Sequence, residues 1–378
     1  MSDGVTGKAK NLKGIVGALL VLLCPRVSVA NTFVAFGPKT YRYAPGKPAP
    51  QSTSFTVLNP ATTYTLRIHN GGLSNEFNRV SSGVITLNGV EIAKPNDFNQ
   101  NVALIEKPVT LAAANTLTVE VRGPSGGGLT LQIVGVDNDP PTVSATAVPP
   151  PNAAGWNKTP VSVTFACSDA TSGIATCPAP VTVSTDGMAQ VISGTAVDRV
   201  GNSATTSLTL NLDTTPPTLT PVITPVPNAA GWNKTAVTVD FIARDALSGL
   251  ADLTPRTTVT SEGAAQVITG TASDLADNRS TARATVNFDT TPPSLTITKP
   301  ATGTLEREAE IILSGRVSDP VSGIAAVSCN GNAGTVSGAA FECPLTLTPG
   351  TNTLQVQVSD IAGHTAHATT ITPSQVFP

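Results

Sequence analysis

Aromatic and charged side chains are scarce in this chain of 378 residues, at 4% and 12% of the composition. Long surface helices are rich in charged residues, so this scarcity argues against a helical protein. Only three histidines are present, His69, His364 and His367, and we expect the last two to face opposite sides of a strand end and not to share a metal. No glycine loop ending in Lys-Ser or Lys-Thr occurs. We therefore expect no enzyme active site in these residues.

Glycine and proline, by contrast, are abundant, with 32 and 31 copies, and Thr, Ser, Val and Ala supply much of the rest. Hydrophobic residues make up 40% of the chain and alternate regularly with polar ones, which argues against disorder. This combination favours short β-strands joined by glycine and proline turns.

The chain contains a duplication, in which residues 140–215 recur at 216–291 without a gap. The run PNAAGWNKT is present in both copies. Within each copy, alternating segments such as residues 161–167 and 237–243 are separated by turn residues every 8–12 positions. About seven short strands in a unit of this size are typical of an immunoglobulin-like β-sandwich.

Two further units flank the repeats. Residues 31–138 contain six segments with strand character, and Asn88-Gly89 within one of them predicts a hairpin. Residues 292–378 keep the order of the repeat motifs but are longer between them. We predict an all-β protein of tandem immunoglobulin-like β-sandwich domains in an elongated array, divided as follows: 1–30 signal peptide, 31–138 N-terminal domain, 139–215 repeat 1, 216–291 repeat 2 and 292–378 the last domain.

The first 30 residues have the pattern of an export signal. Lys8, Lys10 and Lys13 precede an apolar run over 14–24 that is too short to span a bilayer, and small residues end the segment at Ala30. An uncleaved membrane anchor is the alternative. We expect a secreted or cell-surface protein with no membrane span after signal removal. Residues 31–378 would carry a net charge of −6, which does not favour nucleic acid as a partner.

Four cysteines follow the signal, at positions 167, 177, 329 and 343. Cys167 and Cys177 are replaced together in the second copy, by Ala243 and Leu253, which indicates that they bond to each other. Cys329 and Cys343 then form a second pair. Metal or redox chemistry is the alternative, but it requires closer spacing.

The repeats resemble the bacterial immunoglobulin-like domains that occur in tandem on exported proteins. The resemblance lies in the sequence DTTPP at 213–217 and 289–293, in the D-x-x-S-G turns and in the D-x-x-G-N turn at 198–202, from which the second copy departs at 274–278. The last unit is similar to the immunoglobulin-like module of glucodextranase-type enzymes. This resemblance implies stalks, spacers, adhesin segments or accessory modules.

Acidic residues gather at the predicted domain junctions, where Asp137, Asp139, Asp213 and Asp289 lie in the linkers. Turn acids of the next domain are expected to approach them, and these are Asp169, Asp245, Asp319, Asp198, Asp274 and Asp360. Carboxylates and backbone carbonyls are calcium ligands, so the junctions are candidate calcium sites. The alternative is that each Asp accepts hydrogen bonds from the backbone of its own turn.

Aromatic residues offer a second kind of candidate, because exposed rings stack on sugars. Trp156 and Trp232 precede core strands, however, where a Trp packs inward, and the N-terminal domain has only Tyr41, Tyr43 and Tyr64. The G-x-S-x-G match at 123–127 is followed by a strand, which predicts a hairpin turn and no nucleophile.

The sequence therefore predicts a non-enzymatic spacer or adhesion protein at the cell exterior, with an unknown protein or a polysaccharide as its partner. Two alternatives remain open. One is a polysaccharide-binding accessory protein, and the other is the non-catalytic N-terminal part of a larger secreted enzyme.

Overall fold

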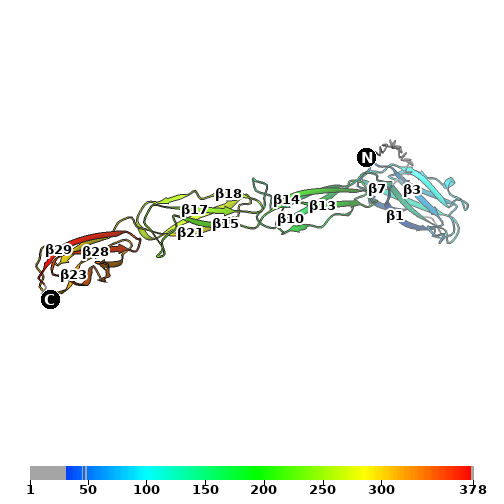
Figure 1. Cartoon of the computed structure of the whole chain (residues 1–378). Helices are drawn as coiled ribbons and strands as arrows, with labels where there is room; N and C mark the ends of the chain where they lie inside the picture. The colour runs from blue at the N-terminus through cyan, green and yellow to red at the C-terminus, as the bar shows by residue number, and fades with distance from the viewer. Residues whose placement is uncertain (1–30, 45, 47–48, 376–378) are drawn as a thin grey trace, which may run out of the picture. The chain divides into compact units, whose positions relative to one another are not determined.

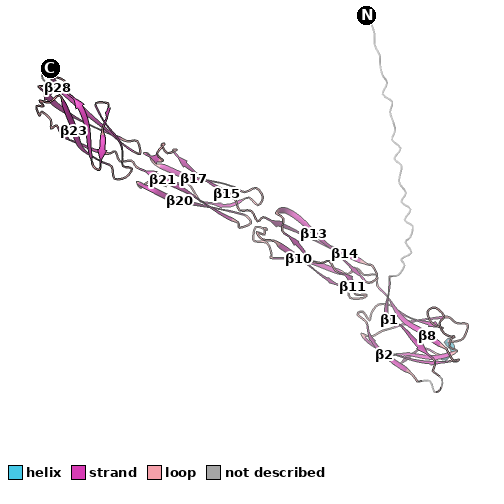
Figure 2. Cartoon of the chain, turned by 90° about the horizontal axis from the view of Figure 1, so that it is seen from below, coloured by secondary structure: helices cyan, strands magenta, loops and turns pink. Residues whose placement is uncertain are grey.

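The computed structural model describes residues 31–44, 46 and 49–375, and these form an almost entirely β-structured protein (Figures 1 and 2). Within this part of the chain the single helical element is the short 3-10 turn η1 (Pro95–Asp97). No helix in the described residues has the length and hydropathy needed to cross a bilayer. The predicted signal peptide at 1–30 lies outside the described residues.

The chain divides into two compact units. The first comprises the described residues up to Val143 together with Cys167–Cys177 and Thr195–Thr205, and the second comprises Ser144–Ala166, Pro178–Gly194 and the described residues from Thr206 onward. Repeat 1 thus contributes residues to both units.

The N-terminal domain of the first unit contains two four-stranded sheets. In spatial order, one sheet consists of β1 (Thr32–Arg42), β8 (Gly128–Val136), β3 (Tyr64–Asn70) and β6 (Leu104–Val109). The other consists of β2 (Gln51–Thr56), β7 (Ala114–Arg122), β4 (Ser82–Leu87) and β5 (Val90–Ala93).

Alternate residues of these strands form one hydrophobic core, because successive side chains of a strand point to opposite faces. Leu66 and Ile68 of β3 and Leu117 of β7 are fully buried in this core. The predicted hairpin is confirmed, since Asn88 and Gly89 join β4 to β5 with positive φ values of 54° and 81°.

The two repeats form the same pair of sheets. In repeat 1 they are β9 (Thr142–Val148), β10 (Val161–Ser168) and β12 (Val181–Val183), and β11 (Ile174–Thr176), β13 (Gly187–Asp198) and β14 (Ser203–Leu212). In repeat 2 they are β15 (Thr218–Thr224), β17 (Val237–Arg244) and β19 (Thr257–Val259), and β16 (Trp232–Asn233), β21 (Arg279–Phe288), β20 (Gly263–Asp274) and β18 (Leu250–Leu253). Repeat 2 has the seven strands expected, whereas repeat 1 has six and a single bridge, Asn157 to Leu212, in place of the seventh.

A glycine opposite a phenylalanine sets the packing in both repeats. A Cβ atom added at Gly194 would lie 2.4 Å from the ring of Phe165, and one added at Gly270 would lie 2.5 Å from the ring of Phe241. Real Cβ atoms do not approach other atoms this closely, so a larger residue at either glycine would displace the ring.

The last domain has two four-stranded sheets. They are β22 (Ser294–Lys299), β23 (Glu310–Ser318), β27 (Ala340–Thr346) and β26 (Thr335–Ser337), and β25 (Asn332–Ala333), β24 (Ile324–Cys329), β28 (Gly350–Asp360) and β29 (Thr365–Ser374). A separate hydrophobic core lies in each of the four predicted domains. The exact boundaries between the domains stay a prediction.

Both predicted disulfides are present, and they lie in different surroundings. Cys167 bonds to Cys177 at a partly exposed corner of repeat 1, where Cys167 is half-buried. Cys329 bonds to Cys343 inside the core of the last domain, where both are fully buried. The first bond closes a corner, and the second joins the two sheets of the last domain directly.

Candidate functional site at the domain junctions

An aspartate follows the last strand of the N-terminal domain and of each repeat. These are Asp137 after β8, Asp213 after β14 and Asp289 after β21. Their side chains are almost completely buried, with exposed fractions of 2%, 0% and 0%. A carboxylate is retained in such a position only when hydrogen bonds replace its lost hydration.

Backbone N–H groups supply those hydrogen bonds, half of them from the next domain. Asp213 Oδ2 accepts the N–H of Ser248 at 3.0 Å, and its Oδ1 accepts the N–H of Thr215 at 3.0 Å. Matching bonds to the serine N–H are 3.0 Å for Asp137 and Ser172 and 3.2 Å for Asp289 and Ser322, although the N–H of Ser322 is shared with Asp319 Oδ1 at 2.8 Å. Each linker carboxylate therefore connects its own linker to a turn of the domain that follows.

The serine belongs to the D-x-x-S-G turn, which is held by its own aspartate. In repeat 2, Asp245 Oδ1 accepts the N–H groups of Leu247 and Gly249 at 3.1 and 2.7 Å. Asp169 and Asp319 form the same bonds in the neighbouring domains. These acids cap their own turns and so present the serine N–H to the linker.

A second turn reaches the linker backbone through an amide side chain. Asn278 Nδ2 donates to the carbonyl oxygen of Asp213 at 2.8 Å and to Asp274 Oδ2 at 2.9 Å. Asn202 makes the equivalent bonds to Asp137 O, at 3.2 Å, and to Asp198 Oδ2, at 2.7 Å. The junction is thus bonded through both the side chain and the main chain of the linker aspartate.

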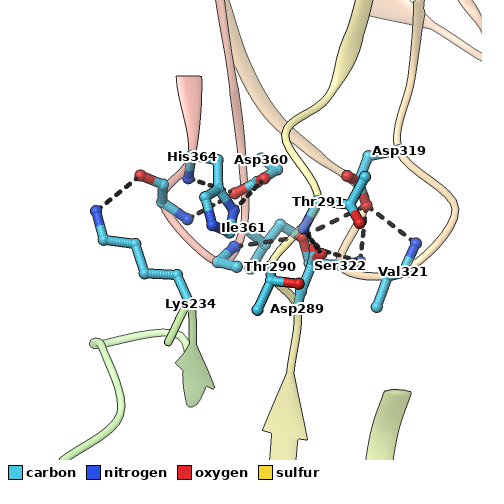
Figure 3. Close-up of polar contacts among 12 residues, drawn as sticks. Lys234, Asp289, Thr290, Thr291, Asp319, Val321, Ser322, Asp360, Ile361 and His364 are labelled. Atoms are coloured by element: carbon cyan, nitrogen blue, oxygen red, sulfur yellow. Dashed lines mark hydrogen bonds and ion pairs between the residues drawn. The ribbon is translucent and has the colours of Figure 1, made fainter. Parts of the chain in front are cut away.

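The last junction has a histidine in place of this asparagine (Figure 3). The ring nitrogen Nδ1 of His364 lies 2.9 Å from Asp360 Oδ2, and Asp360 Oδ1 accepts the His364 N–H at 2.8 Å. Asp289, Asp360 and His364 place one ligand atom each within 4.8 Å of one another. His367 lies on β29 and belongs to none of the groups of possible metal ligands in the described residues, whereas the approach of His364 to these acids was not predicted.

The run PNAAGWNKT of each repeat also contacts the domain that follows. Asn152 Oδ1 accepts the N–H of Trp156 at 3.0 Å, and its Nδ2 donates to the carbonyl of Leu275 at 2.9 Å. Asn228 repeats this arrangement and donates to the carbonyl of Ile361 at 2.8 Å. The identity of this run in the two copies therefore has a structural reason at the junction.

The linker threonines are held by one acid in each repeat. Asp186 accepts hydrogen bonds from Thr214 and Thr215, and these bonds lower its pKa although partial desolvation acts in the opposite direction. Glu262 holds Thr290 and Thr291 in the same way, and the side-chain bond from Thr290 is the main cause of its lowered pKa. Both linkers are thus fixed immediately before their paired prolines.

The structure brings most of the predicted junction acids together. Three groups have one ligand atom per residue within 4.8 Å: Asp137, Asp169 and Asp198; Asp213, Asp245 and Asp274; and Asp289, Asp360 and His364. The side chain of Asp139 is exposed and belongs to none of these groups. Calcium binding at the junctions stays a prediction.

The aromatic candidates are mostly buried. Trp156 is 7% exposed and Trp232 is half-buried, while Tyr41 and Tyr64 are 1% and 2% exposed. The G-x-S-x-G segment at 123–127 connects β7 to β8 as the predicted turn.

Comparison with known proteins supports the assignment of the last domain. Residues 293–375 match the family model described as Glucodextranase, domain B, which is an immunoglobulin-like domain. The resemblance predicted for this unit from its motifs is therefore confirmed. No curated protein is significantly similar to the chain in sequence.

Arrays of immunoglobulin or fibronectin domains are among the solved structures with some likeness to this chain. The N-terminal eight Ig domains of Down Syndrome Cell Adhesion Molecule are 11% identical over 89% of this chain and 49% of that chain, with a TM-score of 0.39, so this chain spans about half their length. Sidekick-1 immunoglobulin domains 1–4 are 14% identical over 90% of this chain and 99% of that chain, with a TM-score of 0.26. The fibronectin(III)-like modules of Clostridium thermocellum CbhA are 9% identical over 62% of this chain and 95% of that chain, with a TM-score of 0.21.

Proposed function

We propose that this chain is a non-enzymatic spacer and adhesion module of an exported protein, in which bonded junctions hold neighbouring immunoglobulin-like domains in fixed relation. The observation that carries this proposal is the recurrence of one bond at three junctions, from the serine N–H of one domain to the buried linker carboxylate of the domain before it. Freely jointed domains would have no need of a buried carboxylate in each linker.

The energetics of such a junction favour order. A buried carboxylate that loses its N–H donors bears the desolvation cost of an unpaired charge, so bending that separates Ser248 from Asp213 is opposed. Rotation within the linker is opposed as well, because Asp186 holds Thr214 and Thr215, and the following prolines have a fixed φ. A series of such junctions transmits the position of one domain to the next.

Two further observations support an exterior location without catalysis. Disulfides persist in oxidising compartments, and the chain contains two of them. The family matched by residues 293–375 is an immunoglobulin-like module and not a catalytic domain. The same match favours the alternative that the chain is an accessory part of a carbohydrate-acting protein.

Small-angle X-ray scattering of the whole chain tests the proposal. We expect an ensemble fit of the scattering curve to give one narrow distribution of the radius of gyration, which broadens when Asp137, Asp213 and Asp289 are all replaced by Ala. Asp139→Ala is the matched control, because this linker acid is exposed and its side chain lies outside the three acidic groups. A broad distribution in the unsubstituted chain would contradict the proposal.

A further inference from the structure

A polar groove lies at one end of the N-terminal domain. It has a volume of about 550 Å³ and is lined by Asn75, Phe77, Asn78, Arg79, Gln100 and Pro124. These residues come from three loops, which follow β3, η1 and β7. β1 and β8 pair Thr32 with Val136 at the end that leads to Asp137, and Arg42 with Gly128 at the other. The groove therefore lies at the end of this domain away from its junction.

The loops that form the groove are held by a buried asparagine. Asn70 is 1% exposed, and its Nδ2 donates to the carbonyls of Val80 at 3.0 Å and of Asn99 at 3.2 Å, while its Oδ1 accepts the Val80 N–H at 2.8 Å. Asn78 is bonded to the third loop, since its Nδ2 donates to the carbonyl of Ser125 at 3.1 Å. A site with its loops fixed in advance loses little conformational entropy when a ligand binds.

Several polar groups of the groove remain available to a ligand. Within the described residues, the side chains of Asn75 and Gln100 make no hydrogen bond and are exposed. Arg79 donates one bond, from Nη1 to the carbonyl of Gln100 at 3.0 Å, which leaves its other N–H groups unused. Arg42 does not line the groove itself but adjoins it, since its guanidinium lies 4.7 Å from the ring centroid of Phe77. No carboxylate of the described residues pairs with Arg42 or Arg79.

The aromatic ring in the groove is not free for stacking. Arg42 lies over Phe77, and a Cβ atom added at Gly128 would lie 2.9 Å from its ring, so the ring packs against the backbone there. Recognition must then come from guanidinium and amide groups. Arginine binds carboxylates, and side-chain amides bind hydroxyl groups as both donors and acceptors.

The charge of the domain agrees with an acidic ligand. Residues 31–138 have eight Lys and Arg against six Asp and Glu, whereas residues 139–378 have 10 against 18. Glu76 is the acid nearest to the groove in sequence, and its carboxylate lies over Gly72. The two positive charges of Arg42 and Arg79 outnumber the single negative charge of Glu76.

We propose that the groove binds a polysaccharide whose sugars carry carboxylate groups. Arg42 and Arg79 would bind the carboxylates, and Asn75, Asn78 and Gln100 would bind the hydroxyl groups. An acidic peptide is disfavoured because the lining offers only one partly buried aromatic ring and one proline for apolar side chains. The proposal supplies a binding end for the spacer described above, yet the two are tested separately, since one concerns affinity and the other distances between domains.

Binding of the whole chain to polygalacturonate tests this proposal, with its fully methyl-esterified form as a polymer of the same backbone without charge. We expect saturable binding that weakens with added salt, and a loss of about ten-fold or more for the ester. The variants Arg42→Gln and Arg79→Gln should each lose about as much. Arg42→Gln removes no hydrogen bond of the described residues, so it is the variant less able to disturb the loops.

Arg67→Gln is the matched control, because it removes the same charge from the middle of β3, where Arg67 pairs with Glu106. Its binding should equal that of the unsubstituted chain. The proposal is overturned by absence of binding, by equal binding of the ester, or by binding that neither arginine variant weakens. Equal binding of poly-glutamate, with the same arginine dependence, would overturn the saccharide assignment.

Discussion

Repeat 1 and repeat 2 share their junction contacts but differ at one corner. In repeat 1 that corner is closed by the bond between Cys167 and Cys177. In repeat 2 the second position is Leu253, whose half-buried side chain packs against the core, and Phe241 is 2% exposed where Phe165 is half-buried. The two copies thus stabilise one corner by different means, a covalent bond in one and apolar packing in the other.

The difference between the two copies indicates which parts of the repeat tolerate substitution. A corner tolerates replacement because any sufficient local stabilisation keeps the strands in place. The linker aspartate and the serine turn are the same in both copies, because the carboxylate has to meet an N–H group of another domain at about hydrogen-bond distance. The linker carboxylate and its serine contact are therefore kept in both copies where the corner is not.

The largest expected effect comes from opening the corner of repeat 1. Replacing Cys167 and Cys177 by Ser should destabilise repeat 1 by about 2–3 kcal/mol, since the bond closes a short loop of the unfolded chain. Hydrogen exchange of the amides of β10 and β13 measures this locally, which is needed because a chain of several domains does not unfold in one step. Equal loss of protection in β17 and β20 of repeat 2 would contradict the independence of the two corners.

Asp213→Ala should lower the free energy of unfolding by about 1–3 kcal/mol, because the N–H groups of Ser248 and Thr215 lose their acceptor. Hydrogen exchange at these two amides should rise. Asp139→Ala should change stability by less than about 0.5 kcal/mol, as for other exposed positions. Similar effects of the two substitutions would show that the buried carboxylate has no special part in the junction.

A smaller change is expected where the second and third junctions differ. Asn278→His should lower the free energy of unfolding by about 0.5–1.5 kcal/mol, because the hydrogen bond from the side-chain amide to the carbonyl of Asp213 is lost. His364→Asn, the reciprocal variant, should gain up to about the same amount if the new amide reaches the carbonyl of Asp289. Thermal unfolding measures the change in stability of both variants. A loss of stability in both would show that the two junctions are not equivalent.

Acid should loosen the linkers. The folded-state pKa values of Asp186 and Glu262 are lowered, so their contribution is complete above the unfolded values near about pH 4 and is lost as the pH falls through the folded values. NMR titration of the Thr214 and Thr290 amides should follow this protonation. In Asp186→Asn the Thr214 signal should no longer move in this range, while that of Thr290 should move as before.

The smallest effect concerns calcium, which we predict to raise the melting temperature by binding the junction acids. The measurement compares calcium with a chelator in the unsubstituted chain and in Asp213→Ala, where the increase should be reduced. An identical melting temperature in calcium and in chelator would leave hydrogen bonds alone to hold the junctions.

Much of the fold could be predicted from residue patterns. Two of the signals are local, namely the alternation at 161–167 and the Asn88-Gly89 turn. The joint replacement of two cysteines is visible when the two copies are aligned. The approach of His364 to Asp289 was not predicted, although Asp360 of the same turn was, because the equivalent residue in the repeats is an asparagine, Asn202 or Asn278, and only the acids were considered. The groove is non-local, since Arg79 and Gln100 meet through loops held by Asn70.

The central claim is that the junction bonds fix neighbouring domains, and a distance measurement across one junction tests it most directly. Spin labels at Ser207→Cys in repeat 1 and Thr285→Cys in repeat 2 lie on exposed positions of β14 and β21. Pulsed electron spin resonance should give one narrow distance distribution, which broadens on addition of Asp213→Ala. A distribution that is already broad, or one whose width Asp213→Ala leaves unchanged, would contradict the claim.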